Sequence, residues 1–127
     1  MGVLCGVDIV EIERIKKSFE TIGIPFRDKV FTEKEIEYCE GKKAVKYQSY
    51  AGRFAAKEAV SKAFGTGISE GLWWKNIEIL NDENGKPNIV LLGTAKDMFE
   101  KIGAKSISLS ISHCDNYAVA YVVMEIK

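Results

Sequence analysis

Two acidic residues of this chain lie in apolar sequence surroundings. Asp8 is flanked by valine and isoleucine in segment 6–10, and Glu58 shares a helical face with alanine and phenylalanine. Burying an unpaired carboxylate is costly, so each must be neutral, ion-paired or bound to a cation. Mg²⁺ commonly takes one or two protein carboxylates and completes its coordination with water and substrate phosphate. Asp8 and Glu58 could therefore share one Mg²⁺, although a structural cap at Asp8 and a solvent-exposed pair of Glu58 with Lys62 are simpler alternatives.

Three further features could bind a substrate or take part in catalysis. His113, the only histidine, lies at the end of a predicted strand, either as a catalytic group or as a hydrogen-bonded turn or core residue. Arg53 and Lys57 lie four residues apart, where they could clamp a phosphate or simply face solvent. The sequence Asn84-Gly85-Lys86-Pro87 predicts a turn, and exposed backbone amides in such a turn could contact a ligand.

Hydrophobic periodicity predicts the elements that position these residues. Asp8 falls in an apolar, β-branched segment, 3–10, which is typical of a buried strand. Glu58 falls in the longest helix, from about residue 45 to 64, whose apolar positions lie nearly all round and indicate that other elements enclose it. We expect shorter helices at 12–22, 32–39 and 94–102, and strands at 77–80, 88–92, 106–112 and 117–126.

The order of these elements predicts the fold class. The last two strands are joined by a short turn and should form a closing antiparallel pair. Interspersed strands and helices predict an α+β fold with an antiparallel sheet, a long central helix and shorter helices. The chain has 127 residues, no repeat and no Gly/Ser/Pro-rich linker, so we expect a single domain over residues 1–127. Because so small a domain has few deep clefts, a large ligand is expected to need a subunit interface.

The composition argues against several classes of protein. Lysine plus arginine and aspartate plus glutamate number 18 each, so the net charge is zero, whereas proteins that bind nucleic acid through its phosphates carry a basic excess. No apolar stretch approaches the roughly 20 residues that cross a bilayer, and the N-terminus lacks the features of a signal peptide. The three cysteines are scattered, which argues against disulfides or a zinc site. We therefore expect a cytoplasmic protein that binds neither nucleic acid nor membranes.

Several short motifs follow one another along nearly the whole chain. They are Gly6-Val7-Asp8-Ile9-Val10-Glu11-Ile12-Glu13-Arg14-Ile15, Phe31-Thr32-Glu33-Lys34-Glu35, Gly52-Arg53-Phe54-Ala55-Ala56-Lys57-Glu58-Ala59, Lys62-Ala63-Phe64-Gly65-Thr66-Gly67, Asn84-Gly85-Lys86-Pro87 and Ser110-Ile111-Ser112-His113. Any one of these motifs is weak, but the ordered set is specific. In this set the chain resembles the holo-acyl-carrier-protein synthases, which are small bacterial 4'-phosphopantetheinyl transferases.

The resemblance implies an enzyme of fatty acid biosynthesis. Such an enzyme transfers the 4'-phosphopantetheine arm of coenzyme A (CoA) to a serine of apo-acyl carrier protein and releases adenosine 3',5'-bisphosphate. Asp8 and Glu58 match the Mg²⁺ ligands of the family. Lys62 matches a residue near the pyrophosphate, and His113 matches a residue of the substrate site. The family assembles as a homotrimer with each active site between neighbouring subunits, which would supply the interface that so short a chain needs.

The residues suit that chemistry. Mg²⁺ held by Asp8 and Glu58 would offset the charge of the pyrophosphate and orient the bond that breaks. Lys62, helped by Arg53 or Lys57, would add positive charge for the departing bisphosphate. Either Glu58 or a Mg²⁺-bound water would accept the serine proton.

Carrier-protein docking should involve a local basic surface. Acyl carrier proteins are acidic, whereas the chain as a whole has no net charge. The first predicted helix offers Arg14 and Lys17 on its outward face, and Arg14 matches a basic position in the family's carrier-binding helix. Thr21 and Ile24 stand where the family often has arginine. The pair Trp73-Trp74 could belong to the core, to an interface or to a CoA contact.

Three other functions are compatible with the same residues. A different Mg²⁺-dependent enzyme could use Asp8 and Glu58 to cleave phosphate esters with water as the acceptor. A non-catalytic α+β adaptor could dock acidic proteins on its basic helix. An RNA-binding α+β domain is the weakest alternative, because the net charge is zero and few aromatic residues are placed to stack on bases.

Overall fold

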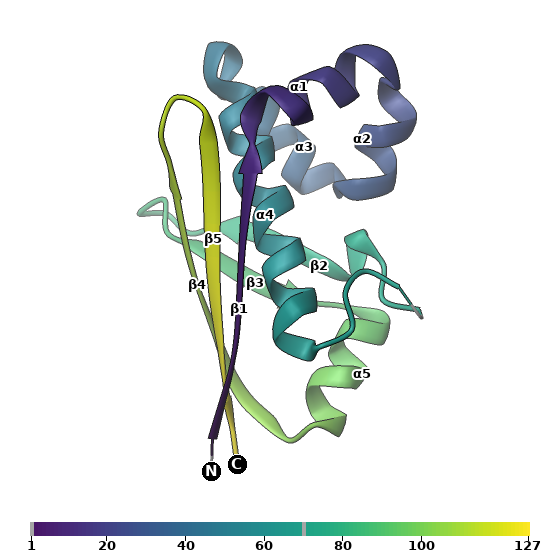
Figure 1. Ribbon diagram of the computed structural model, residues 1–127, viewed down its shortest axis with the longest axis vertical. Helices are drawn as coiled ribbons and strands as arrows, with labels where there is room; N and C mark the ends of the chain where they lie inside the picture. Colours follow the sequence, from purple (N-terminus) through teal and green to yellow (C-terminus); the bar gives the residue numbers. More distant parts are fainter. Residues whose placement is uncertain (1, 70) are drawn as a thin grey trace.

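A long helix, α4 (Lys46–Phe64), packs along one face of a three-stranded antiparallel sheet in the computed structural model of the protein (Figure 1). The sheet has the order β1 (Gly2–Glu11), β5 (Tyr117–Ile126) and β4 (Ala104–His113), so β1 and β4 are its two edges. The structure describes residues 2–69 and 71–127, and no helix within them is long and apolar enough to span a membrane. The predicted α+β class, the long helix and the closing antiparallel pair are confirmed.

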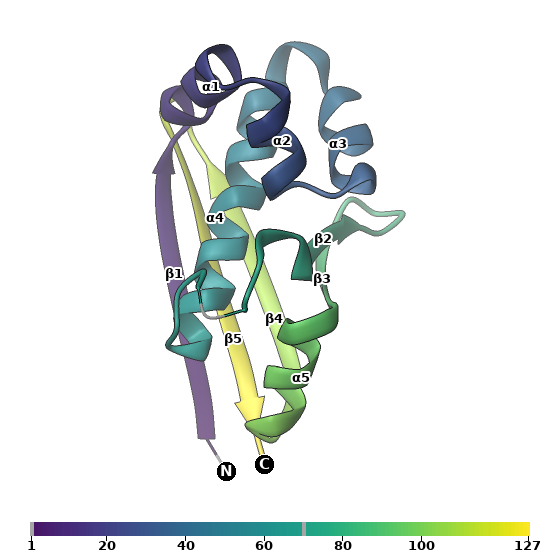
Figure 2. The same cartoon turned by 90° about the vertical axis from the view of Figure 1, so that its right-hand side faces the viewer.

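Three short helices lie between β1 and α4 in the sequence. They gather around the N-terminal end of α4 (Figure 2). Helix α3 begins with the predicted capping box, because Thr32 and Glu35 each accept a hydrogen bond from the other's backbone amide. The seven-residue helix α2 was not predicted, although Pro25 in its first turn is a signal for a helix start. The three helices are α1 (Ile12–Thr21), α2 (Ile24–Val30) and α3 (Glu33–Glu40).

A second, two-stranded antiparallel sheet lies beside α4. The predicted turn joins its strands, and Gly85 in that turn has a φ of 82°, which glycine adopts more readily than other residues. Helix α5 then leads back to β4, and β1 pairs with β5 so that Gly2 lies opposite Ile126, which places the two chain ends side by side (Figure 1). The remaining elements of the fold are the 3₁₀ turns η1 (Lys43–Val45) and η2 (Trp74–Asn76), the strands of the small sheet, β2 (Ile77–Asn81) and β3 (Pro87–Leu91), and helix α5 (Gly93–Lys101).

Small residues allow α4 and the large sheet to approach closely. A Cβ atom built on Gly6 of β1 would lie 1.9 Å from the carbonyl oxygen of Ala59 and 2.8 Å from the amide nitrogen of Ala63. No side chain could be accommodated there without moving the strand away from the helix. The helix side of this contact also consists of small residues, because α4 contributes buried alanines and a valine to the main core.

The interpretation of segment 3–10 as a buried strand is wrong for one of its two faces. The side chains of Val3, Val7 and Ile9 are 61%, 51% and 64% exposed. They point away from α4, because successive residues of a strand point to opposite faces and only one face of the sheet carries the helix. Tyr117 and Tyr121 of β5 extend this exposed apolar surface, at 45% and 46%. We call these five residues the outer sheet face.

Candidate active site

Asp8 and Glu58 line one cavity of about 220 Å³. Asp8 comes from β1 and Glu58 from α4, and Arg14 lines the same cavity from α1. The two acidic residues in apolar sequence surroundings are therefore brought together, and we call this hollow the carboxylate cavity. Its other lining residues are Ile9, Val10, Ile15, Ser18, Phe26 and Phe54.

The close approach at Gly6 explains how Asp8 reaches the helix. Residues 6 and 8 of a strand point to the same face, and the face of Gly6 is the one in contact with α4. Asp8 therefore also faces α4, two residues further along β1 than the contact of Gly6 with Ala59. Glu58 is the neighbour of Ala59 on the helix, so the packing at Gly6 sets the spacing of the two carboxylates.

Lys62 is the ion-pair partner of Asp8. Its Nζ lies 3.0 Å from Asp8 Oδ1 and donates a second hydrogen bond to the carbonyl oxygen of Val7 at 3.1 Å. The Asp8 side chain is 16% exposed, whereas that of Lys62 is 51% exposed and has one side open to solvent. The expected alternative, a solvent-exposed pair between Lys62 and Glu58, is not the arrangement in the structure.

The environment of Glu58 favours a bound cation. Burial raises the pKa of the Glu58 carboxyl group, the negative charge of Asp8 raises it further, and Lys62 partly offsets this rise. Two carboxylates that repel each other in a partly buried hollow are hard oxygen donors of the kind that Mg²⁺ prefers. In the described parts of the chain, no group of three or more Cys, His, Asp or Glu side chains could enclose a metal. The residues fit an ion that takes its remaining ligands from water and substrate.

His113 lines a second cavity, of about 370 Å³, at the β4 edge of the sheet. His113 is exposed, so its interpretation as a core residue is wrong. Gly85 and Pro87 of the β2–β3 turn line the same cavity, and Asn84 lies in this turn with its amide bound to Asp82. We call this hollow the His113 cavity. Its other lining residues are Tyr38, Lys42, Val45, Gln48, Ser49, Gly52, Arg53, Asn81 and Ile111.

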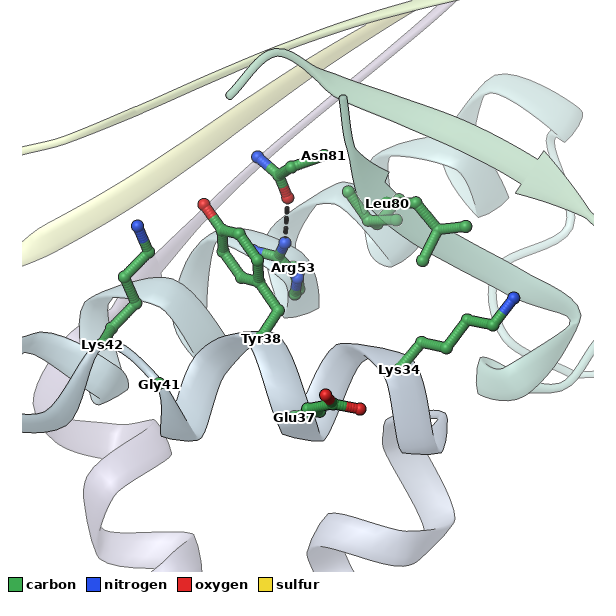
Figure 3. A pocket seen from close by; sticks show the side chains of 9 residues that line it. Lys34, Glu37, Tyr38, Gly41, Lys42, Arg53, Leu80 and Asn81 are labelled. Carbon is green, nitrogen blue, oxygen red and sulfur yellow. Dashed lines mark hydrogen bonds between the residues drawn. The ribbon is translucent and has the colours of Figure 1, made fainter. Parts of the chain in front are cut away.

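A third hollow, of about 560 Å³, adjoins the His113 cavity between α3 and β2 (Figure 3). The two share Tyr38, Lys42, Arg53 and Asn81. Figure 3 shows the Tyr38 ring beside the Arg53 guanidinium group, which is hydrogen-bonded to Asn81. The third hollow is thus an extension of the His113 cavity around these side chains.

Lys57 and Arg53 do not face solvent, so that interpretation of the pair is wrong. Lys57 is fully buried, and its Nζ lies 2.8 Å from Glu35 Oε1 and donates to the carbonyl oxygens of Trp74 and Ile77. An ammonium group enclosed in this way has no surface to offer a ligand, so the structure gives Lys57 a packing role in place of the expected substrate contact. Arg53 is 4% exposed and reaches the wall of the His113 cavity.

The candidate residues therefore fall into two groups at opposite edges of the large sheet. Asp8 lies on β1, and His113 lies on β4, with β5 between them. The carboxylate cavity and the His113 cavity have no lining residue in common. A single chain thus offers two half-sites that face different sides of the molecule.

The predicted docking residues lie beside the carboxylate cavity. Arg14 and Lys17 are exposed on α1, and Arg14 also lines the cavity itself. Trp74 stacks on Phe54 with ring centroids 4.8 Å apart, which makes it a support for the cavity wall. Trp73 is 62% exposed.

Several of the residues that shape the two cavities were not predicted as site residues. Phe54 was predicted only to pack on the helical face of Glu58, although it lies inside the same motif. Tyr38 and Asn81 carry no such signal, because they come from separate elements and meet only in the folded chain.

The chain is similar to known proteins in both sequence and fold. Residues 4–122 match the family model of the 4'-phosphopantetheinyl transferase superfamily. Over 126 residues the chain is 56% identical to the holo-[acyl-carrier-protein] synthase of Ruminiclostridium cellulolyticum, covering 99% of this chain and 94% of that protein. The crystal structure of the Helicobacter pylori synthase in complex with coenzyme A has a TM-score of 0.85 at 35% identity, covering 96% of this chain and 100% of that one. The synthase from Bacillus anthracis, in complex with CoA (3',5'-ADP), has a TM-score of 0.80 at 38% identity, covering 98% and 96%. The chain therefore belongs to the 4'-phosphopantetheinyl transferase superfamily and, within it, to the holo-[acyl-carrier-protein] synthases.

Proposed function

We propose that this enzyme transfers the 4'-phosphopantetheine arm of coenzyme A to a serine of apo-acyl carrier protein, in a Mg²⁺-dependent reaction that serves fatty acid biosynthesis. The observation that carries the proposal is the meeting of Asp8 and Glu58 in one cavity, beside the cation Lys62. The second product is adenosine 3',5'-bisphosphate. The cytoplasmic location stays a prediction from the sequence.

Asp8 and Glu58 of the carboxylate cavity, and Lys62 beside it, each have a role in this reaction. Asp8 and Glu58 would hold Mg²⁺, which when bound offsets the negative charge of the diphosphate and polarises the phosphorus that is attacked. Lys62 is half-exposed at the cavity and can turn from Asp8 to a phosphate oxygen of the substrate, where it stabilises charge on the leaving bisphosphate. Either Glu58 or a water molecule held at the metal would accept the serine proton.

The His113 cavity suits the nucleotide end of coenzyme A. His113 and Lys42 offer nitrogen donors for phosphate oxygens, and the apolar side chains of Ile111 and Pro87 offer surface for a base. The B. anthracis relative was crystallised in complex with CoA (3',5'-ADP), the same chemical fragment. The turn at Asn84-Gly85-Lys86-Pro87 then forms one wall of the nucleotide site.

A complete site would require two chains. The half-sites lie at opposite edges of the sheet, so the β1 edge of one subunit can meet the β4 edge of the next. Repeating such a head-to-tail contact gives a closed ring when the rotation between subunits closes, and we propose a homotrimer on the basis of the family resemblance. The outer sheet face supports this assembly, because a contiguous exposed apolar surface of this kind is typical of an interface.

Subunit mixing tests the shared site. Asp8→Ala and His113→Ala damage different halves, so each variant alone should be inactive. Co-expressed in equal amounts, they should regain about one quarter of the wild-type rate, because that fraction of interfaces in a cyclic trimer combines two intact halves. If both halves belonged to one chain, no mixed assembly would regain activity.

Mass spectrometry of the carrier protein tests the reaction itself. Incubation of the enzyme with CoA, Mg²⁺ and apo-acyl carrier protein should add the mass of one phosphopantetheine arm to the carrier, and EDTA should prevent the gain. Carrier binding without a mass change would indicate an adaptor. Breakdown of CoA without any carrier would indicate a hydrolase.

A further inference from the structure

A chain of hydrogen bonds links α4 to the β2–β3 turn through two side chains, and Figure 3 shows the first bond of this chain, from Arg53 to Asn81. Arg53 donates from Nη2 to Asn81 Oδ1. Asn81 uses its other side-chain group, Nδ2, to donate to the carbonyl oxygen of Gly85 at 2.9 Å. The helix is thereby connected to a turn whose residues line the His113 cavity. We call Arg53 and Asn81 the relay.

Arg53 is held firmly at the start of the relay. It is 4% exposed, its Nη1 donates to Ser49 Oγ at 3.2 Å, and its guanidinium carbon lies 4.2 Å from the centre of the Tyr38 ring. A planar guanidinium group that stacks on a ring and forks between two oxygen atoms has a fixed orientation. The Arg53 end of the relay is therefore anchored to the body of the protein.

The shape of the turn has a separate cause. Asp82 Oδ1 accepts hydrogen bonds from the amides of Asn84 and Lys86, both at 2.9 Å, and the Gly85 amide donates to the Asp82 carbonyl oxygen. These contacts close the turn on itself without Arg53. Asp82 therefore fixes the conformation of the turn, whereas the relay fixes its position relative to α4.

We propose that Arg53 and Asn81 are positioning residues for the coenzyme. By holding the Gly85–Pro87 wall against α4, they set the width of the His113 cavity and thus the affinity for the nucleotide end of CoA. The proposal rests on the proposed function for the identity of the ligand. It assigns Arg53 a role through Asn81, in place of the direct phosphate contact that its charge suggests. Carrier docking and the chemical step depend on the separate carboxylate cavity and should be unaffected.

Two variants test the relay. Arg53→Lys keeps the positive charge but cannot fork between Asn81 and Ser49, and Asn81→Ala removes the link to Gly85. Each should raise the KM for CoA by about tenfold, the effect of losing a charge-assisted hydrogen bond. The kcat and the KM for the carrier should stay within about twofold of wild type. The double variant should be no worse than either single one, because both interrupt one connection.

The matched control is Asn88→Ala, which removes a side-chain amide that donates to the Lys86 carbonyl oxygen of the same turn, at 3.2 Å, outside the relay. It should leave the KM for CoA unchanged. Circular dichroism and thermal unfolding should show that all variants remain folded.

A second readout does not depend on CoA. In the ligand-free protein, ¹⁵N relaxation should show lower order parameters for the amides of Asn84, Gly85 and Lys86 in both relay variants and wild-type values in Asn88→Ala. This result would support the relay even if the proposed substrate were wrong. A raised KM with an unchanged turn would overturn the proposal, since Arg53 would then act on the ligand directly. Additive effects of the two substitutions, or no change in either readout, would also overturn it.

Discussion

The ammonium group of Lys62 lies 3.0 Å from Asp8 Oδ1, on the carboxylate that we propose as a metal ligand. A cation bound at Asp8 must compete with this ion pair. Lys62→Met should therefore tighten Mn²⁺ binding to the CoA-free enzyme by about threefold to fivefold, the range expected for a half-exposed pair. Electron paramagnetic resonance of free Mn²⁺ measures the affinity. The same variant should lower kcat by about 100-fold, because it removes charge stabilisation at the phosphate.

Arg14→Met is the matched control for this experiment. Arg14 lines the same cavity, so its loss removes one positive charge without removing the hydrogen bond to Asp8. A smaller gain in Mn²⁺ affinity is expected than for Lys62→Met. Equal gains would show that general repulsion, and not the ion pair, opposes the metal.

The raised pKa of Glu58 leads to two predictions, one for the pKa itself and one for the stability of the fold. Asp8→Asn removes one of its two causes, so the Glu58 pKa should fall toward the free value of about 4.3. A ¹³C NMR titration of the metal-free protein checks this shift. If the pKa stayed at its wild-type value in Asp8→Asn, the two carboxylates would not interact.

The same shift predicts that Glu58→Gln stabilises the metal-free fold. When a carboxyl pKa is higher in the folded than in the unfolded state, its stabilising contribution is present at low pH and is lost as pH rises through the folded pKa. Glu58→Gln should therefore raise Tm at pH 7 by about 1–3 °C and have little effect near pH 4. It should also abolish most of the activity. A lower Tm at pH 7 would contradict this sign.

Two substitutions on α1 test carrier docking, and only one of them lies at the carboxylate cavity. Lys17→Glu reverses a charge outside the lining of the carboxylate cavity, and Arg14→Gln removes one that lines it. Both should raise the KM for the carrier protein, Lys17→Glu by about fivefold or more, with the KM for CoA little changed. Raised salt should weaken carrier binding in wild type and less so in the variants. Equal effects on both substrates would indicate misfolding.

Gly6→Ala should disturb both the fold and the site. The added methyl group would lie 1.9 Å from the Ala59 carbonyl oxygen, so β1 must move away from α4. We expect a loss of about 2–3 kcal/mol in the free energy of unfolding, typical of an overpacked contact. Weaker metal binding should follow, because Asp8 moves with the strand. Gly2→Ala is the control in the same strand, since a Cβ there would meet nothing within 4 Å, and chemical denaturation compares the two.

Local signals predicted much of the fold. The capping box at Thr32, the long helix to Phe64 and the strand at 117–126 were all predicted from nearby residues, and the structure confirms them. Helix α2 was missed because seven residues are too few to show a helical period. The exposed outer sheet face was missed because apolar content alone does not tell whether both faces of a strand are covered within one chain.

The site was predictable only in part for a related reason. Apolar neighbours correctly marked Asp8 and Glu58 as unusual. The same sequence gave no sign that Lys57 is buried against Glu35, while Arg53 reaches Asn81. Those partners are more than 20 residues away along the chain, so helical spacing carries no information about them. The pairing of Lys62 with Asp8 was hidden for the same reason.

The pairing of Gly2 with Ile126 places both ends of the chain together at the tip of the large sheet. Asp8 lies six steps along the strand from Gly2, which is about 20 Å at the usual rise of a strand. An affinity tag or a fused carrier protein attached at either end would therefore start well away from the metal ligands. A short linker could also join the two ends, so that new termini could be opened in an exposed loop, giving a circular permutant for engineering.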